Sequence, residues 1–93
     1  MMVDEKIAQL REEIDEINFE LLKLLNKRLN VVELIGLQKE RQGLKTHDPA
    51  REGQILAQLL EKNQGPMTDE MVIQLFQEIF KLSVEYQEKY KKE

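Results

Sequence analysis

Charged side chains interrupt an apolar helical pattern at spacings that suit the binding of a small anion. Between residues 7 and 38, aliphatic residues recur at alternating steps of three and four, but Arg28 occupies one of these positions. A permanent charge on an apolar seam is unfavourable unless something pairs with it, and a bound anion is one candidate. Lys39 follows eleven residues later, within ~20° of Arg28 around a helix and ~16 Å along it. Two long cationic side chains leaning toward each other could hold a small anion between them.

Two further apolar stripes turn polar over part of their length. The polar residues are Asp48, Arg51 and Glu52 before the apolar part of the second stripe, and Ser83 and Gln87 after the apolar part of the third. If the three helices pack together, these side chains and the two cations line a closed pocket with a cationic bias. Such a pocket suits a small polyanion.

Most of these residues also have a plain structural explanation. Asp48 can be a helix cap, Glu52 a surface acid, and Lys39 a lysine whose stem covers apolar surface near a helix end. Arg28 is harder to explain in this way, because a buried charge needs a partner. The combination is much less expected by chance than any single residue. His47, the only histidine, is expected to be solvent-exposed in a loop and to have no catalytic role.

Three helices are predicted to position these residues in one domain, residues 1–93. Charged residues make up 34% of the chain and aromatic residues 5%, which favours an all-α fold over a sheet protein. The first helix is expected over residues 4–41, with Gly43 as its stop, and the second from Pro49 to about Lys62. The third follows a Thr68 cap. Residues 89–93 are expected to be a frayed tail or a linker remnant.

Composition excludes several classes of function. There is no cysteine, and therefore no disulfide framework, thiolate metal site or thiol nucleophile. A net charge of −4 argues against nucleic-acid binding. No apolar run approaches the ~20 residues that span a bilayer, and the first residues lack the apolar core of a signal peptide. We expect a cytoplasmic protein that binds neither nucleic acid nor membrane.

The predicted helix lengths indicate a homodimer. The first helix would be about 57 Å long, the second about 20 Å and the third about 33 Å, so neither shorter helix can cover the first. Its first half would leave Ile7, Leu10, Ile14 and Ile17 in water, which a small monomer tolerates poorly. The long three-four repeat favours pairing with another helix at a coiled-coil-like angle. We therefore predict an intertwined homodimer of three-helix chains.

Taken together, these residues resemble the all-helical chorismate mutase family over nearly the whole chain, from Leu10 to Gln87. The matching motifs are Leu10-Arg11-x-x-Ile14-Asp15, Arg28 after a leucine-rich run, Ile35-Gly36-x-x-Lys39, Asp48-x-x-Arg51-Glu52 and Ser83-x-x-x-Gln87. Further motifs look most like the mutase domain fused ahead of DAHP synthase in some bacteria. These are Gln42-Gly43, Asp48-Pro49, Asn63-Gln64-Gly65-Pro66 and Phe76-x-x-Ile79-Phe80. The chain is expected to be a free mutase or a domain of such a fusion.

The resemblance implies conversion of chorismate to prephenate by an intramolecular Claisen rearrangement, with no cofactor and no metal. It also implies an intertwined dimer, in agreement with the length argument. Protein groups would hold the dicarboxylate in a reactive geometry and stabilise the negative charge that grows on the ether oxygen.

The resemblance also implies a role for each site residue. Arg28 would bind one substrate carboxylate, Arg11 of the partner chain another, and Lys39 a carboxylate and the ether oxygen. Gln87 would donate to the ether oxygen, and Ser83 would assist at a carboxylate. Glu52 would accept the ring hydroxyl near the Asp48 backbone. Arg51 would contact substrate or orient Glu52. The expected catalytic residues are Lys39, Gln87, Arg28 and Glu52.

Two other functions stay open at this stage. The same pocket could be a regulatory module that binds chorismate or prephenate and controls a DAHP synthase in cis or in trans. The chain could also be a helical dimerisation domain without a ligand, which a chorismate-like dicarboxylate would not stabilise against thermal unfolding.

Overall fold

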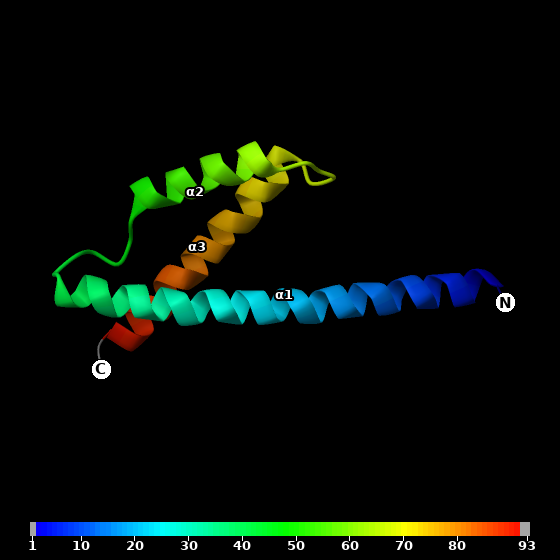
Figure 1. The fold of residues 1–93 in the computed structure, drawn as a ribbon, viewed down its shortest axis with the longest axis horizontal. Coiled ribbons are helices and arrows are strands. Elements are labelled where there is room, and N and C mark those ends of the chain that lie inside the picture. Colours follow the sequence, from blue (N-terminus) through cyan, green and yellow to red (C-terminus); the bar gives the residue numbers. More distant parts are fainter. Residues whose placement is uncertain (1, 92–93) are drawn as a thin grey trace. The chain divides into compact units, whose positions relative to one another are not determined.

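The computed structural model describes residues 2–91 and contains three α-helices (Figure 1). They are α1 (Met2–Arg41), α2 (Pro49–Lys62) and α3 (Asp69–Lys91). No strand occurs among the described residues. The predicted all-α fold of one long and two shorter helices is therefore confirmed. Three residues of the expected tail, 89–91, belong to α3. Residues 92–93 lie outside the described part of the chain, and a linker remnant there stays a prediction.

The chain divides into two compact units, and the boundary falls within α1, between Val31 and Val32. The described part of the first unit is helix alone. Its aliphatic stripe is exposed in the single chain, with Ile7 at 42%, Ile14 at 55% and Leu24 at 63% of full accessibility. This stripe has the composition of a packing surface but lies open.

The end of α1 is fixed by Gly43. Its φ of 69° lies in the left-handed region that favours glycine. The Leu44 amide donates to the Lys39 carbonyl at 2.8 Å, and the Gly43 amide donates to the Glu40 carbonyl at 3.2 Å. This pair of bonds is the Schellman arrangement, and it confirms Gly43 as the stop.

The starts of α2 and α3 are set by local caps. The Asp48 side chain accepts from the Arg51 amide at 3.1 Å, and Pro49 is the first helical residue. Thr68 caps α3 by accepting from the Met71 amide at 3.2 Å. Both caps are as predicted.

In the second unit, α2 packs against α3 over a small core (Figure 1). The buried hydrophobic residues among those described are Val72 and Phe80, at 6% and 5% exposure. The rings of Phe76 and Phe80 lie 6.1 Å apart at a tilt of 58°. The buried polar residues are Thr46 and Ser83. No helix in the described part of the chain is both long enough and apolar enough to cross a membrane.

Candidate anion-binding site

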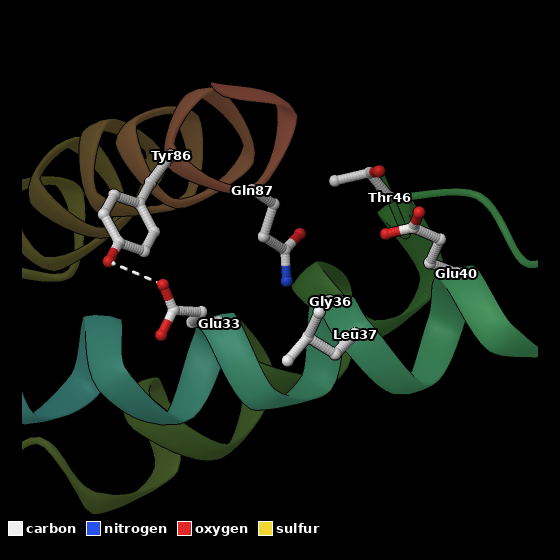
Figure 2. Close-up of a pocket in the computed structure, with 7 residues that line it drawn as sticks. All are labelled: Glu33, Gly36, Leu37, Glu40, Thr46, Tyr86 and Gln87. Atoms are coloured by element: carbon white, nitrogen blue, oxygen red, sulfur yellow. Dashed lines mark hydrogen bonds between the residues drawn. The ribbon is translucent and has the colours of Figure 1, made fainter. Parts of the chain in front are cut away.

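The side chain of Gln87, near the end of α3, is bonded to the backbone of α1. Its Nε2 donates to the Val32 carbonyl oxygen at 2.8 Å, and Figure 2 shows the amide pointing at α1 beside Gly36. Only the NH₂ end of the amide can donate to a carbonyl, so this bond fixes which way the amide faces. Nε2 carries a second N–H, which is the group that a ligand oxygen would need.

Lys39 is held by the loop that follows α1. Its Nζ donates to the carbonyl oxygen of Thr46 at 2.9 Å, and the lysine is half-buried. Thr46 is itself buried, so the acceptor is firmly placed. The Lys39 carbonyl meanwhile takes part in the Gly43 stop. The ammonium and the backbone carbonyl of Lys39 are therefore both bonded to the loop between α1 and α2. The ammonium keeps further N–H groups for a ligand.

A small pocket brings the surroundings of these two donors together (Figure 2). It is lined by Glu33, Gly36, Leu37, Glu40, Thr46, Tyr86 and Gln87. Gln87 thus shares a pocket with Thr46, the residue that Lys39 contacts. The Tyr86 hydroxyl donates to the Glu33 carboxylate at 3.2 Å on one side of the pocket. This bond ties α3 to α1 one residue before Gln87.

Glu52, on the first turn of α2, has an unexpected neighbour. His47 Nε2 lies 3.3 Å from Glu52 Oε2. The His47 side chain is 58% exposed, so its predicted exposure is confirmed, but this contact was not predicted. Both residues line a second cavity in which Phe80 and Val84 provide apolar surface. Glu52 is half-buried and has lone pairs on two oxygens, which leaves capacity to accept a ligand hydroxyl.

The remaining residues of the predicted set on α2 and α3 are occupied locally. Asp48 serves as the α2 cap, as the plain structural explanation expected. Arg51 is exposed and its Nη1 donates to Gln54 at 3.4 Å. Ser83 is buried, and its hydroxyl donates to the Ile79 carbonyl at 2.8 Å. Ser83 therefore lies where it can face the interior, whereas Arg51 lies on the surface of the single chain.

The two arginines expected at the site belong to the first unit. Arg11 is exposed, whereas Arg28 is half-buried. Burial lowers the pKa of Arg28 from its ordinary value. The cause is desolvation, which disfavours the charged form, so a ligand carboxylate beside Arg28 would offset it.

No group of three or more His, Cys, Asp or Glu side chains that could hold a metal ion occurs among the described residues. The side chains predicted to form the site are instead cations, an amide, a hydroxyl and carboxylates. Such a donor set is typical of proteins that bind a small oxygen-rich anion, and here it would be carried by an all-helical chain.

Comparison with known proteins gives the family. The family Chorismate mutase type II matches residues 10–88, and the chain belongs to it. The match includes every residue that the sequence predicted for the site, from Arg11 to Gln87.

Two curated relatives and one solved structure illustrate the likeness. The chain is 33% identical over 91 residues to a bifunctional chorismate mutase/prephenate dehydratase of Aquifex aeolicus, covering 94% of this chain but 25% of that relative. It is 30% identical over 90 residues to a chorismate mutase of Methanocaldococcus jannaschii, covering 96% of this chain and 91% of that one. The crystal structure of chorismate mutase from Helicobacter pylori in complex with prephenate aligns with a TM-score of 0.88 at 36% identity, covering 94% of each chain.

These relatives confirm the family that the sequence resembled. One of them is joined to a prephenate dehydratase, and the chain spans about a quarter of its length. The other has nearly the length of this chain. Neither name includes a DAHP synthase, so that finer resemblance stays a prediction.

Proposed function

We propose that this protein converts chorismate to prephenate. The observation that carries the proposal is the family match over residues 10–88, which spans all eight predicted site residues. The bound prephenate in the Helicobacter pylori relative supports the choice of ligand. The arrangement of donors in the second unit supports the choice of chemistry.

The rearrangement breaks one C–O bond and forms one C–C bond within a single molecule. Negative charge grows on the ether oxygen as the C–O bond breaks, so fixed N–H donors aimed at that oxygen lower the barrier. Lys39 and Gln87 have the required groups, and each is already oriented by a backbone carbonyl, that of Thr46 and of Val32 respectively. We assign the largest catalytic effect to Lys39, because it adds a full positive charge to its donors.

The other residues hold the substrate in its compact geometry. Glu52 accepts the ring hydroxyl, with the backbone near Asp48 beside it. Ser83 assists at a carboxylate by turning its one O–H from the Ile79 carbonyl to the ligand. Arg28 binds a carboxylate, which compensates the desolvation of its guanidinium. Arg51 contacts substrate or supports Glu52. The exposed guanidinium of Arg51 favours a contact through water over a direct one.

The site is completed by a second copy of the chain, which contributes Arg11. The exposed aliphatic stripe of α1 supports this proposal, because Leu10, Ile17 and Leu21 are 48%, 52% and 49% exposed in the single chain. Covering the exposed half of each such side chain is worth about 1 kcal/mol. A second copy offers a stripe of the same kind, which a two-fold symmetric interface would pair with the first.

The test adds chorismate to the purified chain and follows the loss of its diene absorbance while prephenate is identified as the product. Chorismate should be converted at a steady rate that is proportional to the protein concentration. Chorismate that stays unchanged over a concentration range of the protein contradicts the proposal.

Control of a DAHP synthase, in cis or in trans, is a separate proposal for the same pocket. It is supported by four motifs that look like the mutase domain fused ahead of DAHP synthase: Gln42-Gly43, Asp48-Pro49, Asn63-Gln64-Gly65-Pro66 and Phe76-x-x-Ile79-Phe80. Mixing the chain with a DAHP synthase should then give inhibition that requires prephenate. Cytoplasmic location likewise stays a prediction, and fractionation of the source cells would check it.

A further inference from the structure

Gly36 lies in the interior of α1, where glycine is less favourable than alanine. A local reason for its presence is therefore expected. A Cβ built at Gly36 would lie 3.3 Å from Gln87 Cγ, 3.4 Å from Nε2 and 3.5 Å from Cδ. The first of these distances is tighter than ordinary van der Waals contact, so the Gln87 side chain would have to move by a few tenths of an ångström.

The contact is particular to this glycine. Gly53 also lies within a helix, α2, and a Cβ there would meet nothing within 4 Å. The two positions have the same residue and the same type of backbone, and they differ in what stands beside them. Gly53 is therefore a matched control for Gly36.

The direction of a helical side chain explains the effect on Gln87. A Cα–Cβ bond in an α-helix tilts toward the N-terminus, so a side chain covers the turn before its own residue. Val32, whose carbonyl accepts from Gln87, lies one turn before Gly36. A side chain at position 36 would thus intrude on the path by which the amide reaches this carbonyl. Figure 2 shows the amide of Gln87 in this position next to Gly36.

We infer that Gly36 is a positioning residue for Gln87. The missing side chain lets the Gln87 amide lie against α1, bonded to the Val32 carbonyl, so that its second N–H is fixed for donation to the ether oxygen of the substrate. This inference rests on the proposed function.

The test compares Gly36→Ala with Gly53→Ala, each alone and each combined with Gln87→Ala. Turnover of chorismate, KM and thermal unfolding are measured for every variant. Displacing a donor by a few tenths of an ångström should lower kcat of Gly36→Ala about 3- to 10-fold while KM changes less than about twofold. Gly53→Ala should keep the kcat of the parent protein. In the Gln87→Ala background, Gly36→Ala should have no further effect on kcat.

A readout that does not depend on turnover accompanies the kinetics. The side-chain amide NMR signals of Gln87, assigned by their loss in Gln87→Ala, should shift in Gly36→Ala and stay in place in Gly53→Ala. Such a shift supports the contact even if the parent protein leaves chorismate unchanged, which would overturn the proposed function alone.

Two results would overturn the positioning role itself. One is a Gly36→Ala protein with the kcat of the parent and unshifted Gln87 signals. The other is an equal fold loss from Gly36→Ala with and without Gln87, because the glycine would then act by another route.

Discussion

The two units of the chain differ in how far their own residues complete the predicted site. In the second unit, Lys39 donates to the backbone carbonyl of Thr46, and Gln87 donates to that of Val32. In the first unit, Arg11 and the aliphatic stripe around it are exposed. One chain therefore orients two of the proposed donors by itself, whereas the proposed binding of a substrate carboxylate by Arg11 would need a second chain.

The largest effect is expected at Lys39, the charged donor of the second unit. In the proposed mechanism, Lys39→Ala removes the cation that stabilises developing charge on the ether oxygen, so kcat should fall by about 10²–10³. Since the Gly43 stop uses the backbone of Lys39, the helical content should stay close to that of the parent. Steady-state kinetics and circular dichroism check the two halves. Unchanged turnover in Lys39→Ala would remove this residue from the mechanism.

A pH-dependent loss is expected from Gln87→Glu. A carboxyl group can donate to the Val32 carbonyl or to the ether oxygen only while it is protonated. Activity of the variant should therefore be greatest at acidic pH and decline as the carboxyl ionises, whereas the amide of the parent has no such transition. The measurement is kcat against pH for parent and variant.

Gln87→Met serves as the control, because it is of similar length and has no donor at any pH. It should be impaired throughout the pH range. A Gln87→Glu profile that is parallel to the parent would show that donation from this position is not used.

A smaller effect is expected at the Gly43 stop, which anchors the loop that holds Lys39. Gly43→Ala forces an L side chain to a φ of 69° and should cost about 1 kcal/mol of unfolding free energy. Gly43→Asn should cost less, because asparagine tolerates the left-handed region better. Chemical denaturation of both variants checks the order. Equal stability of the alanine and asparagine variants would argue against strain at this position.

Local patterns made the fold largely predictable from the sequence. Asp48-Pro49, Thr68 and Gly43 mark helix ends through bonds to residues three to five positions away, and the structure places these ends where the sequence did. Such bonds depend on neighbours in the chain, so their residue types carry the information.

The contacts that orient the site were not predictable in the same way. Gln87 and Lys39 both donate to backbone carbonyls, and every residue has a carbonyl, so the acceptors have no signature in the sequence. The contact of His47 with Glu52 was missed because His47 was expected to be exposed in a loop, whereas Glu52 was expected to accept a substrate hydroxyl. Gly36 did offer a signal, since glycine inside a long helix suggests a close approach by another group. Which side chain approaches Gly36 could not be predicted from the sequence; in the structure it is Gln87.

The central claim is that the donors of one chain act together with Arg11 of another. Mixing Arg11→Ala and Arg28→Ala proteins, each inactive alone, tests it most directly. Each mixed dimer would contain one site with both arginines and one site with neither, so after random exchange at equal amounts the turnover should recover to about a quarter of the parent value. Turnover that stays at the level of the separate variants, although mass measurements show that mixed dimers have formed, would contradict the account.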